Sequence, residues 1–220
     1  AHVDAGKTTF AEQLLYHTNS IRSRGRVDHK DAFMDSHEIE RARGITVFAG
    51  QAVMRYNDST YYLLDTPGHA DFSAEMERAL RTMDYAVVLL SAVEGVEGHT
   101  ETVWQLLRRY RVPAFFFINK TDRAGADAGR VLGEIRGLLT GDAAELMDTV
   151  EVGGGESGES VRIADSLKDF LAERDEALLE DHLEDRLSPE QWTDALIAAI
   201  RDCRIYPCLH GSALLDVGVT

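Results

Sequence analysis

Short apolar runs alternate with amphipathic segments along most of the chain. Residues 87–90 and 115–118 are apolar at every position, as in strands that are covered by helices on both faces. Residues 99–111, between them, repeat their apolar positions at helical spacing instead. This alternation predicts an α/β fold with a doubly wound, mostly parallel sheet. The ligand of such a sheet lies at the carboxyl ends of its strands.

The same pattern gives expected bounds for each element. Strands are expected at residues 47–56, 61–65, 85–92, 113–119 and 205–210. Helices are expected at residues 7–17, 70–82, 99–111 and 126–139. The turn Asn57-Asp58-Ser59-Thr60 between the first two strands is short enough for a hairpin, so one edge strand is expected to be antiparallel.

The composition changes sharply between residues 142 and 203. This stretch holds 18 of the 38 acidic residues but 5 of the 23 basic ones, so it carries −13 of the net charge of −15. We therefore expect one compact domain, residues 1–141 and 204–220, and an inserted acidic α+β subdomain, residues 142–203. Glycines at 153–155 and 158 predict a flexible loop in the insert. Its short strands are expected at 149–152 and 160–163, and its helices at 166–186 and 189–203, where Ser188 is the N-cap.

Composition excludes several classes of protein. With 220 residues and 44% hydrophobic content, the chain can bury a proper core. No apolar run approaches the roughly 18 residues of a membrane helix and no leader precedes the first motif, so a cytoplasmic protein is expected. Cys203 and Cys208 form neither a zinc site nor a disulfide framework. The net charge argues against a broad nucleic-acid surface, although a local basic patch stays possible.

The first eight residues, Ala1-His2-Val3-Asp4-Ala5-Gly6-Lys7-Thr8, follow the phosphate-binding loop pattern, with alanine in place of the first glycine. Successive backbone N–H groups and the start of the next helix would hold a chain of phosphates. Lys7 would neutralise the β- and γ-phosphates, and the Thr8 hydroxyl would bind Mg²⁺. Taken alone, the motif fits a capped loop-to-helix turn equally well.

Three further motifs follow predicted strands. Asp65-Thr66-Pro67-Gly68-His69 places an acid where it can hold the metal through water, and its glycine lets the backbone approach a γ-phosphate. Asn119-Lys120-Thr121-Asp122 and Gly211-Ser212-Ala213 follow two later strands. Four motifs in this order, each at a strand end, predict a P-loop NTPase fold that binds a guanine nucleotide.

Asp122 is the residue that indicates guanine rather than adenine as the base. Its carboxylate can accept hydrogen bonds from guanine N1–H and N2–H₂, and adenine offers neither group. Two bonds to a charged acceptor, each about 1.5 to 3 kcal/mol, give a discrimination of about 10² to 10⁴. Taken singly, Asp122 is an ordinary helix N-cap and Asn119 an ordinary turn residue. A P-loop ATPase or kinase is the alternative class.

These motifs resemble those of the GTPase domain of ribosome-dependent translation factors such as elongation factor G. The similar segments are residues 1–9, 43–46, 65–69, 119–122 and 211–213. The similarity covers nearly the whole chain, including an insert before the last motif. The shorter insert and residues 26–30 and 72–75 look most like the tetracycline-resistance ribosomal-protection proteins. Elongation factor G proper and release-factor-type GTPases are the alternatives within the family.

The resemblance implies a role for each matching residue. It implies nucleotide contacts from Asp4, Ala5, Gly6, Lys7, Thr8, Thr9, Gly68, Asn119, Lys120, Asp122, Ser212 and Ala213. It implies Mg²⁺ ligation by Thr8, Thr46 and, through water, Asp65. Catalytic roles fall to His69, Thr46, Lys7 and Asp4: His69 would orient the attacking water, and Thr46 would reach that water and Mg²⁺. The simpler alternatives are a satisfied histidine at position 69 and a loop carboxylate at position 4.

The resemblance also implies the ribosome as partner, through its GTPase-activating region and its stalk protein. Arg22, Arg24, Arg26 and Lys30 would make a local contact to ribosomal RNA phosphates, and a solvated loop explains them equally well. RNA would repel the acidic insert, so the insert is expected to face the stalk protein or solvent. A monomer without membrane contact is expected.

Two functions from different classes stay open. The first is a GTP-hydrolysing switch with GTP or GDP and Mg²⁺ as cofactors, in which the γ-phosphate orders residues 18–46 and 65–80. The second is a module that holds the nucleotide without hydrolysing it. The fold also needs a strand that leads into the phosphate loop, so the sequence is expected to be a fragment in which the first strand is missing.

Overall fold

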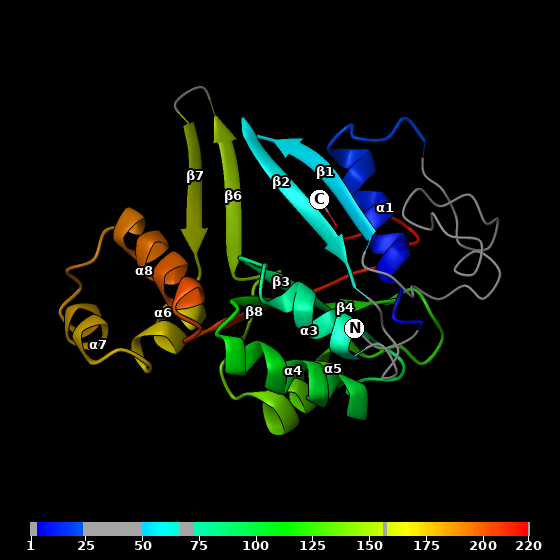
Figure 1. The fold of residues 1–220 in the computed structure, drawn as a ribbon. Coiled ribbons are helices and arrows are strands. Elements are labelled where there is room, and N and C mark those ends of the chain that lie inside the picture. The colour runs from blue at the N-terminus through cyan, green and yellow to red at the C-terminus, as the bar shows by residue number, and fades with distance from the viewer. Residues whose placement is uncertain (1–3, 24–49, 67–72, 156–157, 220) are drawn as a thin grey trace.

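The computed structural model describes residues 4–23, 50–66, 73–155 and 158–219, whose arrangement is drawn in Figure 1. The strands are β1 (Gly50–Tyr56), β2 (Ser59–Asp65), β3 (Ala86–Ser91), β4 (Ala114–Asn119), β5 (Ala143–Glu145), β6 (Val150–Gly155), β7 (Gly158–Ile163) and β8 (Tyr206–His210). The helices are α1 (Lys7–His17), α3 (Ser73–Leu80), α4 (Gly98–Tyr110), α5 (Ala128–Glu134), α6 (Asp165–Ala172), α7 (Glu176–Leu183) and α8 (Pro189–Arg201), and a π-helical turn, η3 (Ile135–Leu139), follows α5. No helix within these ranges has both the length and the apolarity needed to cross a membrane.

Within the described ranges, four parallel strands form the central sheet, in the order β3-β4-β8-β5. Val88 lies opposite Phe116, and Phe116 lies opposite Cys208, so these side chains share one face. That face packs against α3, α4 and α5 in the main core. Trp104 of α4 anchors it: its ring centroid lies 4.6 Å from that of Tyr206.

Helix α1 packs against the other face of the same strands. Leu89 and Phe117, each next to a residue of the main core, point to this side and contact Phe10 of α1. The ring centroids of Phe10 and Phe117 lie 4.7 Å apart. Because helices cover both faces of a parallel sheet, the predicted doubly wound α/β fold is confirmed.

The predicted hairpin is also confirmed, with a tighter turn than expected. Strands β1 and β2 form their own two-stranded antiparallel sheet in the described part of the chain, so the expected antiparallel edge strand of the central sheet is not observed there. Asn57 and Asp58 alone make the turn, and both have positive φ angles, 44° and 59°. Such a two-residue turn matches the twist of the strands that it joins. Ala52 of β1 packs against Ala11 and Leu15 of α1.

The acidic insert forms its own small core beside the sheet. Its helices lie together at the opposite end of the molecule from α1 (Figure 1). Trp192 and Leu196 of α8 pack against Leu167 and Leu171 of α6 and against Ile163 of β7. As expected, Ser188 caps α8: it accepts a hydrogen bond from Gln191 N–H, and the Gln191 side chain accepts one from Ser188 N–H.

Two expectations about the insert need correction, and one of its strands was not predicted. The sequence gives no sign of β5, which pairs in parallel with β8 and joins the insert to the central sheet. Glycines 153–155 do not form a loop, because they continue β6 in a hairpin with β7. The single helix expected over 166–186 is two helices, because Asp175 begins α7 as an N-cap and accepts a hydrogen bond from Leu178 N–H.

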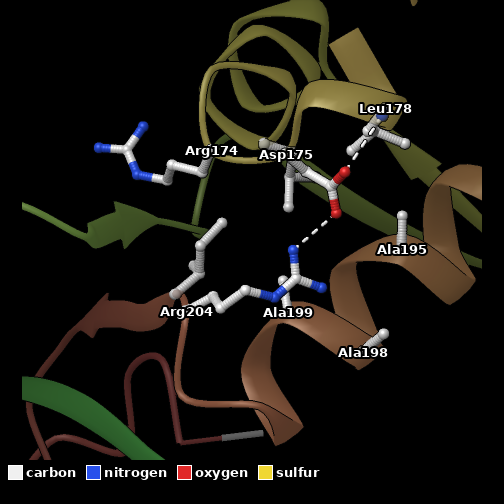
Figure 2. A pocket seen from close by; sticks show the side chains of 9 residues that line it. Arg174, Asp175, Leu178, Ala195, Ala198, Ala199 and Arg204 are labelled. Atoms are coloured by element: carbon white, nitrogen blue, oxygen red, sulfur yellow. Dashed lines mark hydrogen bonds and ion pairs between the residues drawn. The ribbon is translucent and has the colours of Figure 1, made fainter. Parts of the chain in front are cut away.

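Asp175 also closes a small pocket of about 170 Å³ between α6, α7 and α8 (Figure 2). Its second carboxylate oxygen lies 2.8 Å from Nη1 of Arg204. The cap bond from Leu178 and the positive charge of Arg204 together outweigh burial, and they hold the pKa of Asp175 below its usual range. The ionised side chain therefore stabilises the folded insert.

Replacing Asp175 with alanine should lower the free energy of unfolding by about 1 kcal/mol, the usual cost of losing an N-cap. Asp175→Asn keeps the capping oxygen and should retain most of the stability. Because the folded pKa is depressed, the advantage of aspartate over asparagine is full at neutral pH. It should begin to fall near pH 4, the pKa of an unfolded aspartate, and be lost only as the pH falls through the lower pKa of the folded protein. Urea unfolding at pH 7 and at about pH 3.5 measures both effects, with Glu173→Ala as the exposed control; an equal advantage at both pH values would contradict the assignment.

Candidate functional site

The described part of the turn into α1 has a left-handed backbone at two residues. Asp4 and Gly6 have positive φ angles of 62° and 90°, and Gly6 O accepts a hydrogen bond from Phe10 N–H at 2.9 Å. No side chain in the described ranges caps the start of α1. The N–H groups of its first turn, and the positive end of its dipole, are therefore suited to an anion. This first turn consists of Lys7, Thr8 and Thr9, all partly exposed.

Asn119 joins three of the predicted motifs. It is the last residue of β4 and is 3% exposed. Its Nδ2 donates to Ala5 O of the phosphate loop at 2.9 Å, and its Oδ1 accepts from Ala213 N–H at 2.9 Å. One buried amide therefore holds the phosphate loop and the loop after β8 together at the carboxyl ends of the strands.

The turn after Asn119 exposes an acid beside this junction. Lys120 has a positive φ angle of 66°, and Thr121 N–H donates to Gly211 O at 3.1 Å. Asp122 is exposed and accessible to a ligand. Lys120 Nζ lies 3.8 Å from Glu94 Oε2, and hydrogen bonding with Ser91 together with this positive charge holds the pKa of Glu94 below its usual range. This ion pair restrains the Lys120 side chain next to the loop after β3.

The loop after β8 is closed and compact. Ser212 and Val217 exchange backbone hydrogen bonds of 2.9 Å in both directions. A Cβ at Gly211 would lie 2.0 Å from Val217 O, so the close approach of the two segments requires glycine there. Ser212 and Ala213 are buried at 1% and 0% exposure. Their backbone is therefore held in one position beside Asn119.

Some of the predicted site residues lie outside the described ranges. They are Thr46, Gly68 and His69, together with Arg24, Arg26 and Lys30 of the predicted RNA contact. Asp65 is described: it ends β2 and is 7% exposed. Arg22 is described as an exposed residue after α1.

The sequence did not reveal the residues that hold the loop after β3. Arg130 of α5 donates to Ala92 O at 3.2 Å and to Val93 O at 2.7 Å, and it also pairs with Glu134. Glu134 accepts a hydrogen bond from Val96 N–H at 3.0 Å. This loop carries Glu94, so α5 supports Lys120 indirectly. The only available signal was the i,i+4 spacing of an arginine and a glutamate, which is typical of a solvated helix face.

Thiol chemistry has no place in this site. Both cysteines are free, and burial raises the pKa of Cys208 to about 12 and that of Cys203 above its usual value. Neither is therefore a thiolate near neutral pH. Among the described residues, no group of three or more His, Cys, Asp and Glu side chains could hold a metal ion.

Comparison with known proteins identifies the family. The model of the family described as "Elongation factor Tu GTP binding domain" matches residues 1–220. The chain belongs to this family. The predicted resemblance is thereby confirmed, and the chain is a GTP-binding domain of the translation-factor type.

Several curated proteins are similar to this GTP-binding domain over its whole length. It is 43% identical to the tetracycline resistance protein TetM of Streptomyces lividans, and it covers 35% of that protein. It is 39% identical to the oxytetracycline resistance protein of Streptomyces rimosus and covers 34% of it. It is 34% identical to elongation factor G 1 of Geobacter sulfurreducens and covers 37% of it. The chain thus spans about a third of the length of these relatives.

A solved structure supports the fold of this GTP-binding domain. A crystal structure of a protein from Thermus thermophilus superposes with a TM-score of 0.84 at 28% sequence identity. The match covers 99% of this chain and 37% of that one. The central sheet and the insert of this chain therefore both have counterparts in a longer chain of known structure.

Proposed function

We propose that this domain binds and hydrolyses GTP for a ribosome-dependent translation factor of the tetracycline-resistance ribosomal-protection type. The observation that carries the proposal is the position of Asn119, whose side-chain amide binds both the phosphate loop and the loop after β8. A nucleotide that lies across this amide would meet phosphate-binding N–H groups at one end and the Asp122 carboxylate at the other. The family of the chain supports guanosine as the nucleoside.

The nucleotide contacts divide into two groups. Asp4, Ala5, Gly6, Lys7, Thr8 and Thr9 would surround the phosphates, together with Gly68. Asn119, Lys120, Asp122, Ser212 and Ala213 would surround the base. Asp122 is exposed, so its two oxygens are accessible to guanine N1–H and N2–H₂. The base group selects the nucleotide, and the phosphate group supplies most of the charge complementarity.

Mg²⁺ fits the donor atoms of the proposed phosphate group. Hydroxyl and carboxylate oxygens are its preferred ligands, and it retains several waters. Thr8 lies in the first turn of α1 and Asp65 ends β2, so both lie at element ends where a ligand of this fold binds. Thr8 and Thr46 would bind the ion directly, and Asp65 through water. The ion would neutralise charge on the β- and γ-phosphates.

Hydrolysis in this proposal depends on positioning. The transition state of phosphoryl transfer is loose and spreads negative charge over the γ-phosphate oxygens. Lys7 and the first-turn N–H groups of α1 would stabilise that charge. His69 would orient the attacking water with Thr46, and Asp4 would stand in the same loop as Lys7. Because orienting groups need a fixed geometry, turnover should be slow until a partner orders them.

The proposed partner is the ribosome, in the cytoplasm, with the protein acting as a monomer. Residues 1–141 and 204–220 would form the GTP-binding unit, and 142–203 the accessory subdomain that faces the stalk protein. Arg22, Arg24, Arg26 and Lys30 would contact ribosomal RNA next to the nucleotide. The charge distribution supports this division, because the acidic insert is unsuited to RNA.

The alignments favour the ribosomal-protection subgroup over elongation factor G. The alignment with TetM spans 222 positions for the 220 residues of this chain, and the alignment with elongation factor G 1 spans 255. The alignment with elongation factor G 1 has at least 35 positions at which this 220-residue chain has no residue. Release of ribosome-bound tetracycline would support the protection function, and promotion of translocation would instead identify an elongation factor G.

Phosphate release by the complete natural protein tests the proposed activity. We expect slow hydrolysis of GTP alone and an increase of several orders of magnitude with ribosomes, comparable to the roughly 10⁵-fold gain when a partner completes other GTPase sites. His69→Ala should remove most of that increase and leave GDP affinity unchanged. Binding without ribosome-stimulated release would identify a nucleotide-binding module instead. Competition by ATP at the concentration of GTP would contradict the guanine assignment.

A further inference from the structure

Helix α1 also contacts the loop after β8 by its side chains. Gln13 Nε2 donates to Ala213 O at 2.7 Å. One turn later, His17 Nε2 lies 2.6 Å from Asp216 Oδ1. Residues four apart lie on the same face of a helix, so one face of α1 binds both ends of a loop that lies about 200 residues away in sequence.

Both backbone groups of Ala213 are held by side chains. Its N–H donates to Asn119 Oδ1 at the end of β4, and its C=O accepts from Gln13 of α1. Asn119 in turn donates to Ala5 O, just before α1 begins. These bonds form a closed ring: phosphate loop, Asn119, Ala213, Gln13, and back along α1 to the phosphate loop. All four residues are at most 3% exposed, so water does not compete for the bonds.

Hydrogen bonds within the loop after β8 connect its two ends, so a contact at one end restrains the backbone at the other. The reciprocal bonds between Ser212 and Val217 close it. Leu215 N–H donates to Ser212 Oγ at 3.2 Å, and Gly218, at φ 71°, packs against His210 O. The contact between His17 and Asp216 therefore restrains the Ser212–Ala213 backbone as well.

We propose that Gln13 and His17 are positioning residues for guanine-nucleotide retention, an inference that rests on the proposed function. Neither would touch the nucleotide. Both attach the base-binding loop to the helix whose first turn forms the phosphate site, and so fix the separation between the two ends of the nucleotide pocket. A ligand that spans both ends is retained longer when this separation is held in advance.

Gln13→Leu tests the proposal because it should affect nucleotide retention more than folding. The substitution removes the donor to Ala213 O, but it also removes Gln13 Oε1, a buried oxygen with no hydrogen-bond partner among the described residues. These two effects on stability oppose each other. The dissociation rate of fluorescent GDP from the complete natural protein should rise about tenfold, which corresponds to about 1.4 kcal/mol. The KM for GTP should rise with it, while the ribosome-stimulated kcat stays unchanged.

Leu15→Val is the matched control. Leu15 lies on α1 at 1% exposure, but it packs toward Ala52 of the hairpin rather than toward the loop. This variant should lose stability and keep the wild-type GDP dissociation rate. If both variants accelerate dissociation equally, general loosening of α1 explains the effect and the proposal is overturned.

Two experiments test the contact between His17 and Asp216: a substitution that restores the hydrogen bond, and a double variant of both residues. His17→Phe should accelerate GDP dissociation by about threefold, and His17→Gln, whose amide can still donate to Asp216, should restore most of the wild-type rate. If the two residues act as a pair, the double variant His17→Phe/Asp216→Ala should accelerate dissociation by less than the product of the effects of the two single variants. Additive effects would contradict the pair. Wild-type rates in every variant would refute the positioning role alone, whereas absence of GDP binding by the wild type would refute the proposed function instead.

Discussion

Replacing Asp122 with asparagine should weaken GTP binding by a factor of about 10² to 10⁴, the value of two hydrogen bonds to a charged acceptor. The same variant should bind xanthosine triphosphate more tightly than GTP. An asparagine amide can donate to the 2-oxo group of xanthine, where the aspartate would repel it. Isothermal titration of both nucleotides with Mg²⁺ present measures the reversal.

The matched control is Asp127→Asn, five residues further along. Asp127 caps α5 by accepting a hydrogen bond from Arg130 N–H. Asparagine is an equally good cap, so this variant should keep both its stability and its preference for guanine. An unchanged preference in Asp122→Asn would mean that another group reads the base.

Replacing Gly6 with alanine should reduce guanine-nucleotide affinity at least about a hundredfold, because two effects add. The new Cβ would lie 2.4 Å from Asn119 Nδ2, which would break the bond from that amide to Ala5 O. The φ angle of 90° also lies in a region that costs an L-residue about 1 to 2 kcal/mol. Fluorescent GDP titration gives the affinity.

Gly133→Ala is the control for adding a methyl group to a glycine of this protein. Gly133 lies within α5, and no atom lies within 4 Å of the Cβ that alanine would add. This variant should bind GDP normally and gain about 0.5 to 1 kcal/mol in stability from the better helix propensity of alanine. Normal GDP affinity in Gly6→Ala would show that Asn119 does not organise the pocket.

The main sheet was predictable because its strands are apolar on both faces. The runs at 87–90 and 115–118 leave no choice of element, and α1 has the predicted bounds. The sequence motifs follow the carboxyl ends of parallel strands, which all lie at one edge of the sheet. Ala5, Asn119 and Ala213 were therefore expected to lie close together. The wider set of roles assigned to the nucleotide pocket stays a prediction.

The insert was harder to predict because its elements depend on tertiary contacts. Strand β5 has the sequence Ala-Ala-Glu, which has no preference for a strand, and it is extended because it pairs with β8. The glycines of β6 predicted a loop, but they are extended because they pair with β7 in a hairpin. Gln13 and His17 were missed for the same reason: their partners lie about 200 residues away, and no local pattern on α1 marks them.

Strand β5 changes where the insert can be cut. Ala143–Glu145 belongs by sequence to the acidic stretch, yet it forms the edge of the parallel sheet. A chimaera that exchanges this subdomain between related factors should therefore have its first junction after Glu145. A junction before Asp142 would replace β5, the strand that pairs with β8.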